Sequence, residues 1–115
     1  MSKTQSKLGT TIPNDYLVYT AHISQTALDD PIATVLKNTI GDIDWTYDSV
    51  GTYAGTLTGA FTLNKTWLII NQEDDNTNFN TIGRTNANTI KIKSYSVGVL
   101  ADDVLGTSIE IRVYP

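Results

Sequence analysis

The side chains best suited to acid–base or nucleophilic chemistry are few and lie apart in the sequence. His22 is the only histidine, and it lies in the middle of a predicted strand. A catalytic triad or a histidine metal site needs acidic or nucleophilic partners around that imidazole, and no motif places them there. No serine lies in a nucleophile-elbow motif, and no glycine-rich loop follows a strand to bind phosphate. We therefore predict that the protein is not an enzyme and that His22 serves packing or an interface.

Neighbouring carboxylates form a second group of candidates. Glu73-Asp74-Asp75-Asn76 offers consecutive oxygen ligands, as Ca²⁺ prefers, but it lacks the alternating spacing and the glycine of an EF-hand loop. Asp29-Asp30 and Asp102-Asp103 lie in predicted turns, which explain them more simply than acid–base catalysis does. These patterns favour a solvated loop at 72–80, with a bound cation there as the alternative, and we expect no cofactor.

Aromatic side chains are candidates for sugar binding, because a flat ring pairs with the apolar face of a pyranose. Most aromatic residues of this chain occupy alternating strand positions, which predicts a place in the core. Trp45 is the expected exception, because its strand is short and flanked by acidic residues. The sequence thus offers one candidate glycan-binding site, made of Trp45, Asp44 and Tyr47.

The elements that must position these side chains are predicted to be strands. Thr is the most abundant residue type, and it is accompanied by Ile, Val and Tyr, which fit a pleated, half-buried surface. The runs of Ala, Leu, Glu and Lys that are typical of helices are missing. The 115 residues suffice for one core but not for two, so we expect a single domain over 15–115.

Alternation of apolar and polar residues locates the individual strands. It is clearest near the last residues, where Ile109, Ile111 and Val113 share one face, and Ile90 and Ile92 are likewise expected to face inward. The run 66–71 is nearly all apolar, which predicts a central strand covered on both faces. Short strands at regular spacing predict an all-β fold, either a β-sandwich or a jelly roll of about eight antiparallel strands, over 16–23, 32–37, 43–47, 52–62, 66–71, 81–85, 89–95 and 108–115.

Several absences narrow the class of protein. The chain has no cysteine, which excludes disulfides and thiolate metal sites. Eight Lys and Arg against twelve Asp and Glu give a net charge of −4, which opposes nucleic-acid binding. No stretch approaches the roughly 20 apolar residues of a membrane span. The polar start lacks the apolar run of a secretory signal, so we expect synthesis in the cytoplasm without a signal peptide.

Residues 1–14 differ in composition from the rest of the chain. Ser, Thr, Lys and Gln dominate them, and Pro13-Asn14 marks a turn before the first strand. We predict that this segment is a flexible arm that is either disordered or docked on a partner.

Five segments together point to a known family: WTYD at 45–48, GTY at 51–53, TLTGAFT at 56–62, NKT at 64–66 and SIEIRVYP at 108–115. They resemble a small β-domain that recurs in bacteriophage and prophage-like proteins of Bacteroidetes, often at the C-terminal end of longer virion or fibre chains. The resemblance covers about residues 16–115. It implies a virion context, with synthesis in the host cytoplasm, and it implies no catalytic residues.

Because the domain here carries only a short arm, the resemblance favours a separate virion component, such as a capsid decoration, a spike or a head- or tail-fibre subunit. Lys3 and Lys7 of the arm would then anchor the protein on an acidic capsid surface. We expect a homo-oligomer, with a trimer favoured, that assembles through an apolar sheet face beside other virion proteins. The alternative is a carbohydrate-binding adhesin that attaches to a host surface glycan through Trp45. No membrane insertion is expected.

Overall fold

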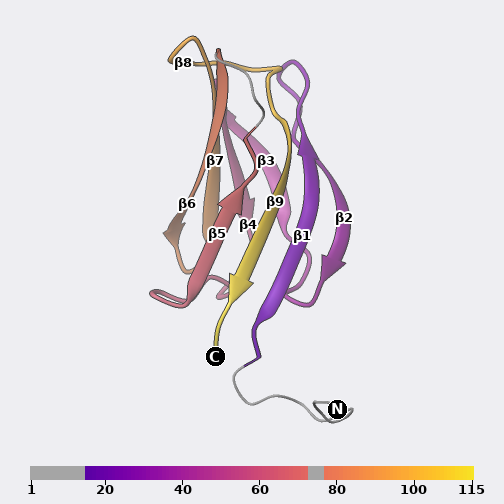
Figure 1. Cartoon of the computed structure of the whole chain (residues 1–115), viewed down its shortest axis with the longest axis vertical. Helices are drawn as coiled ribbons and strands as arrows, with labels where there is room; N and C mark the ends of the chain where they lie inside the picture. Colours follow the sequence, from indigo (N-terminus) through magenta and orange to yellow (C-terminus); the bar gives the residue numbers. More distant parts are fainter. Residues whose placement is uncertain (1–14, 73–76) are drawn as a thin grey trace.

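The computed structural model describes residues 15–72 and 77–115, in which all regular secondary structure is β-strand. Two antiparallel sheets pack face to face, with the strand orders β2-β1-β9-β5 and β3-β4-β7-β6, and the short β8 pairs with β7 (Figure 1). This arrangement confirms the predicted all-β sandwich. The strands are β1 (Leu17–Ser24), β2 (Ile32–Asn38), β3 (Asp44–Ser49), β4 (Thr52–Thr56), β5 (Thr66–Ile70), β6 (Asn78–Asn86), β7 (Thr89–Ser96), β8 (Val99–Leu100) and β9 (Gly106–Val113).

The boundaries of two strands differ from the predicted ones by more than two residues, and one short strand is unpredicted. The strand expected over 52–62 ends at Thr56, and the chain turns at Gly59, whose φ of +69° is easily reached only by glycine. The strand expected from 81 begins at Asn78, because pairing with β7 extends to Ser96. The two residues of β8 lie in a predicted loop and pair with the end of β7.

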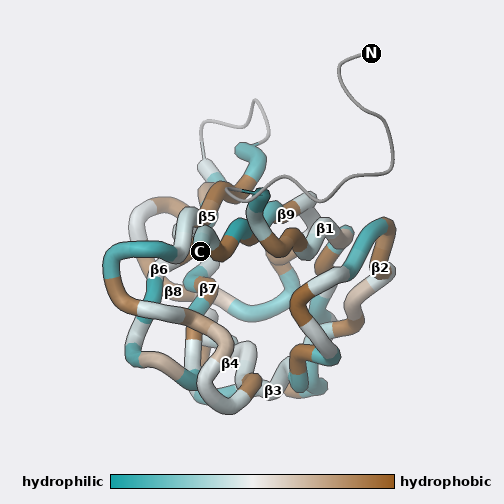
Figure 2. The backbone as a smooth tube through the Cα atoms, turned by 90° about the horizontal axis from the view of Figure 1, so that it is seen from below, coloured by the Kyte–Doolittle hydropathy of each residue, from teal (hydrophilic) through white to brown (hydrophobic). Residues whose placement is uncertain are grey.

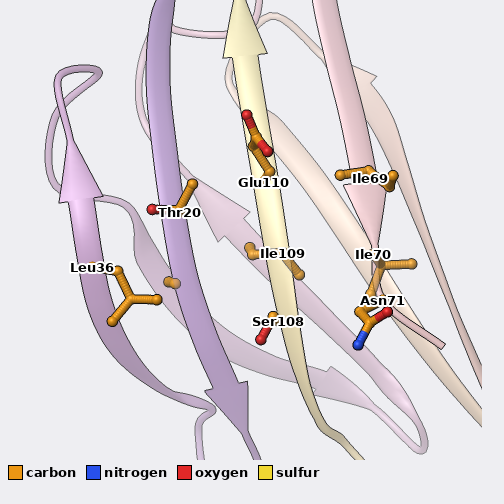
Figure 3. Close-up of a pocket in the computed structure, with 9 residues that line it drawn as sticks. Thr20, Leu36, Ile69, Ile70, Asn71, Ser108, Ile109 and Glu110 are labelled. Carbon is orange, nitrogen blue, oxygen red and sulfur yellow. The ribbon is translucent and has the colours of Figure 1, made fainter. Parts of the chain in front are cut away.

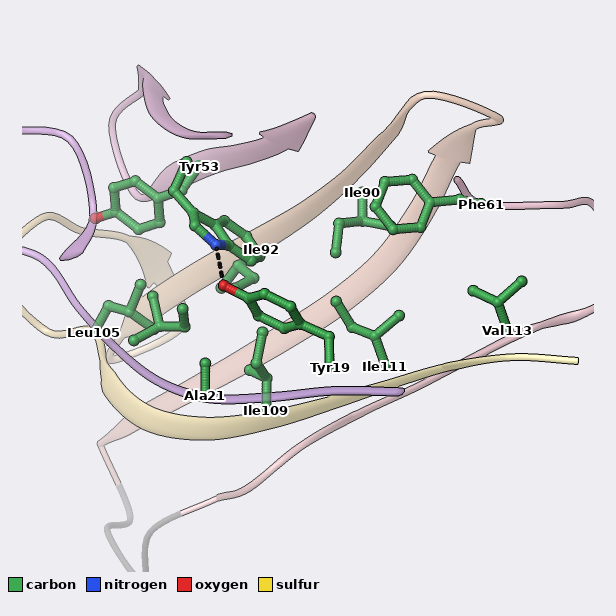
Figure 4. Packing of buried hydrophobic residues seen from close by; sticks show 12 residues of the cluster. Tyr19, Ala21, Tyr53, Phe61, Ile90, Ile92, Leu105, Ile109, Ile111 and Val113 are labelled. Carbon is green, nitrogen blue, oxygen red and sulfur yellow. Dashed lines mark hydrogen bonds between the residues drawn. The ribbon is translucent and has the colours of Figure 1, made fainter. Parts of the chain in front are cut away.

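Figure 2 shows the two sheets facing each other. The core lies between them and is filled mainly by alternate residues of their strands, together with Phe61 and Leu105 from loops (Figure 4). Ile90 and Ile92 are fully buried, which confirms their predicted orientation. Each large apolar side chain buried in this way contributes about 1.5–3 kcal/mol to folding. The buried cluster consists of Tyr19, Ala21, Ile23, Trp45, Tyr53, Phe61, Ile90, Ile92, Leu105, Ile109, Ile111 and Val113.

The last strand, β9, is central in its sheet, whereas β5 lies at the edge. β9 pairs with β1 along its whole length and with β5 from Val113 to Ile109. The prediction that 66–71 forms a central strand covered on both faces is therefore wrong. Trp67 and Ile69 lie on the outer face of β5 and are exposed.

Candidate binding face

Trp45, which the sequence places on the surface, lies in the core. Its side chain is 6% exposed, and its indole N–H donates a 3.2 Å hydrogen bond to the hydroxyl of Tyr19 (Figure 4). Gly55 lies directly opposite Trp45 on β4, and a Cβ at that position would be 2.7 Å from the indole ring. The predicted exposure of Trp45 is wrong because the missing side chain at Gly55 makes room for the ring between the sheets. A ring so buried offers no face to a sugar.

The other two residues of the predicted glycan site do not complete one. Asp44 is exposed, and because consecutive strand residues point to opposite faces, it points away from the core that holds Trp45. The Tyr47 hydroxyl donates a 3.0 Å hydrogen bond to Oδ2 of Asp102, and its ring packs 6.0 Å from the ring of Tyr53. Tyr47 therefore belongs to a structural cluster at one end of the sandwich.

That cluster is organised by Asp102, whose carboxylate ties loops together. It accepts hydrogen bonds from the hydroxyl of Tyr47 and from the backbone N–H of Gly51 in the turn between β3 and β4, and the Tyr53 hydroxyl oxygen lies 3.4 Å from its Oδ1. The buried side chain of Gln25 accepts a 2.8 Å hydrogen bond from the Tyr53 hydroxyl and a 3.0 Å bond from the backbone N–H of Asp103. Burial, together with the nearby Asp102 carboxylate, raises the pKa of Tyr53. These bonds give Asp102 a structural role, as its position in a turn predicted.

The remaining predicted residues lie apart from any shared site. His22 points outward from β1 and is exposed, so it does not serve packing in the core, and an interface role stays a prediction. Lys3, Lys7 and the acidic segment 73–76 lie outside the described residues. Within 15–72 and 77–115, no three histidine, aspartate or glutamate side chains gather in a group that could hold a metal ion. The same ranges contain no helix long and apolar enough to cross a membrane.

A row of aromatic rings around an arginine crosses the outer face of the first sheet. The guanidinium carbon of Arg112 lies 4.6 Å from the ring centre of Tyr16 and 4.6 Å from that of Trp67. Tyr16 precedes β1, Arg112 lies on β9 and Trp67 lies on β5, so the row spans three neighbouring strands. The ring of Tyr114 packs 5.1 Å from that of Tyr16. We call these four residues the aromatic ladder, and cation–π contacts hold it together.

Hydrogen bonds hold the arginine of the ladder in place. Nη1 of Arg112 donates to the Tyr114 hydroxyl at 3.4 Å, and Nε donates to Oε2 of Glu110 at 2.7 Å. These bonds raise the pKa of Arg112 above a value that is already high, so the guanidinium stays charged. The Glu110 carboxylate offsets that charge, which leaves the ladder and its acidic partner without net charge.

A groove of about 310 Å³ continues from the ladder along the same face (Figure 3). Leu36 of β2 and Ile69 of β5 stand on its two sides. Thr20, Ser108 and Glu110 lie between them and supply hydroxyl and carboxylate groups. Apolar walls with a few polar groups are typical of sites that bind small molecules. Glu110 connects the two features, because it lines the groove and forms an ion pair with Arg112 of the ladder.

The free edge of β2 lies beside the groove. β2 ends the first sheet, and among the strands described here β1 is its only pairing partner. Its side chains include Ile32, which is 69% exposed, and Leu36, which is 70% exposed; Val35 is exposed as well. An apolar edge strand of this kind is a template for pairing with another chain.

The outer face of the second sheet has a different character. Phe79, which is 44% exposed, stacks on Tyr95 with ring centres 4.5 Å apart, at one side of this face. Nζ of Lys91 forms a 2.9 Å ion pair with Oδ2 of Asp48. Most of the neighbouring side chains are small or charged, which favours hydration over binding of an apolar surface. We call the outer face of the second sheet around these side chains the lysine face, and it consists of Thr81, Gly83, Thr85, Lys91 and Lys93.

Sequence reasoning missed the ladder as a cluster. The alternation after residue 108 does agree with the outward positions of Glu110 and Arg112 on β9, and Tyr114 follows the end of this strand. It carried no information on which strands lie beside β9, and therefore none on the rings that flank Arg112. An arginine and a tyrosine on the outward face of a strongly alternating strand are the only signal for this site that the sequence contains.

No family model, curated protein or solved structure compared with this chain matches it. The geometry of the aromatic ladder, the groove and the β2 edge is therefore what bears on function.

Proposed function

We propose that this protein is a non-enzymatic virion structural protein, namely a capsid decoration, a spike or a fibre subunit, that works through self-association. The observation that supports the proposal is the free apolar edge of β2, with Ile32, Val35 and Leu36 exposed on it. The virion setting rests on the segments that resemble phage β-domains.

Pairing with a second copy suits this edge for two reasons. A strand added beside β2 would bond the backbone N–H and C=O groups along it, and backbone hydrogen bonding is how sheet edges bind extended partners. The contact would also bury Ile32 and Val35, which the isolated chain leaves in water. A contact between β2 and a different surface of the next copy forms a ring when the rotation between copies closes, and the closed form that we propose is a trimer.

The arm at 1–14 is the proposed anchor on the particle. Lys3 and Lys7 would meet an acidic surface of another virion protein, and the segment would order on binding. Synthesis in the host cytoplasm followed by assembly into the virion, without nucleic-acid or membrane partners, is the setting that we propose.

The decisive experiment is the solution mass of the 12.6 kDa chain by size-exclusion chromatography with light scattering. We expect the wild type to have the mass of a closed oligomer and the double variant Ile32→Lys/Val35→Lys to be a monomer, because lysines on an edge strand oppose pairing. Val99→Lys is the matched control, since Val99 is exposed on β8 of the other sheet, and this variant should keep the wild-type mass. A wild type that stays monomeric as its concentration rises would contradict self-association.

A further inference from the structure

We propose that the aromatic ladder and the groove beside it form a binding site for a neutral oligosaccharide of about two or three pyranose units. Trp67 lies on β5, at the opposite edge of the sheet from β2, and the groove reaches β2 only at Leu36. Variants of Trp67 and of Ile32 and Val35 therefore test sugar binding and self-association separately. The proposed site also differs from the site that the sequence predicts around Trp45.

Trp67 presents the ring face that a sugar requires. Its side chain is 42% exposed, and Arg112 covers one face of the indole. β5 is the last strand of its sheet, so no neighbouring strand of that sheet lies against the other face. Within the described part of the chain, no second aromatic ring packs on this indole. The C–H groups of a pyranose can therefore stack on the part of the Trp67 indole that remains exposed.

The ladder holds Trp67 in position before a ligand arrives. Arg112 is wedged between the rings of Tyr16 and Trp67, and its own position is set by Glu110 and Tyr114. A side chain that is already ordered loses less freedom on binding than a mobile one does. This arrangement distinguishes Trp67 from an isolated surface tryptophan.

The groove supplies polar partners next to the ring. Ile69 follows Trp67 on the same face of β5, about 7 Å further along the strand. A sugar bound next to the one on Trp67 would thus lie over Ile69. There it would meet the carboxylate of Glu110, which pairs with Ile69 across the strands, and the hydroxyls of Ser108 and Thr20 line the groove further from β5. A small number of hydrogen-bonding groups in an apolar setting orients a ligand of this size.

Charge selects a neutral ligand over an acidic one. The charge of Arg112 is compensated by Glu110 at 2.7 Å, and no other cation lines the groove as the structure describes it. An acidic sugar would therefore find no unpaired positive charge among the residues that line the groove, and its carboxylate or sulfate would lie close to the Glu110 carboxylate. A neutral pyranose has hydroxyls for the polar groups and an apolar face for the indole.

The test is binding to an array of immobilised oligosaccharides that includes neutral hexose and pentose chains and uronic, sialylated and sulfated ones. We expect the wild type to bind neutral chains and Trp67→Ala to bind the same chains about tenfold or more weakly. Phe79→Ala is the matched control, because Phe79 is an equally exposed aromatic residue at the lysine face, and this variant should bind as the wild type does. Absence of neutral-chain binding by the wild type, or equal binding by Trp67→Ala, would overturn the proposal.

Two further variants keep the test decisive. Tyr114→Ala removes a ring of the ladder that lies after the end of β9, so this variant still provides a test if Trp67→Ala does not fold. We expect it to bind neutral chains more weakly than the wild type does. Unchanged binding by this variant would count against the ladder as the site. Glu110→Gln leaves the charge of Arg112 uncompensated, and we expect it to gain binding to acidic chains. Failure to gain it would contradict the charge argument. Light-scattering masses measured in parallel separate loss of sugar binding from loss of self-association.

Discussion

The two tryptophans of the chain lie in similar strands and have opposite fates. Trp45 on β3 and Trp67 on β5 both occupy strands at the edge of their sheets. Trp45 is buried and bonded to Tyr19, whereas the indole of Trp67 stands on the outer face against Arg112. Position at a sheet edge therefore does not decide exposure. What differs is the residue that lies across the strand pair: Gly55 opposite Trp45, and Arg112 opposite Trp67.

The contrast shows how composition misleads where alternation does not. β3 alternates outward polar residues with inward aromatic ones, and that alternation agrees with the burial of Trp45. The acidic neighbours suggested exposure, but they lie on the other side of the strand. β5 has apolar residues on both faces, so neither composition nor period distinguishes its outer face from its inner one.

The largest expected effect comes from removing each tryptophan in turn. Trp45→Ala should lower the free energy of unfolding by about 3–5 kcal/mol, because it leaves a cavity in the core. Trp67→Ala should lower it by about 1 kcal/mol or less, as for a surface residue that loses one cation–π contact. Urea denaturation of both variants measures this difference. Similar losses in the two variants would show that Trp67 is part of the fold and not free to serve a ligand.

A smaller loss of stability should follow from adding a side chain at Gly55, where the indole of Trp45 packs. Gly55→Ala places a methyl group 2.7 Å from the indole and 3.0 Å from Ile43, so it should destabilise the protein by about 1–3 kcal/mol through overpacking. Gly83→Ala is the matched control, since Gly83 also lies in a strand but a Cβ there would have open space around it. Thermal unfolding of the two variants tests the prediction, which fails if both behave alike.

The smallest effect concerns Tyr19, the hydrogen-bond partner of Trp45. Burial raises the pKa of Tyr19, so the folded protein keeps this proton above pH 10 while the unfolded chain, with its ordinary tyrosine pKa of about 10, releases it. Above about pH 10 the unfolded state therefore binds fewer protons than the folded state does, and the free energy of unfolding must fall as the pH rises. Below that pH the contribution of Tyr19 to the free energy of unfolding does not change with pH.

Tyr19→Phe tests that linkage. The variant should be less stable by about 1 kcal/mol near pH 8, because it loses the hydrogen bond from the indole N–H. Above pH 10 its stability should fall less steeply than that of the wild type, because phenylalanine has no proton to release. Denaturation curves recorded from pH 8 to 11 give both quantities, and parallel pH profiles for the two proteins would rule out this role for Tyr19.

The fold class and most strands were predictable from local pattern. Alternation depends only on neighbours in the sequence, and it located β1, β7 and β9 and the inward positions Ile90, Ile92 and Ile109. It failed where the pairing partner set the outcome: β8 and the first residues of β6 are strands because β7 lies beside them. The glycan site predicted at Trp45 failed because the space left by Gly55 exists only once β3 and β4 pair.

By itself, the sequence determined an all-β protein with no cysteine, a small negative charge and strands whose inward faces are apolar, because these properties are carried by composition and by a two-residue period. Only the tertiary structure decided which tryptophan is buried, which strand edges are free and which side chains surround Arg112. The ladder joins Trp67 and Arg112 from two strands with Tyr16, which precedes a third, and these segments lie far apart in the chain. Strand order is set by contacts between segments that no local pattern encodes.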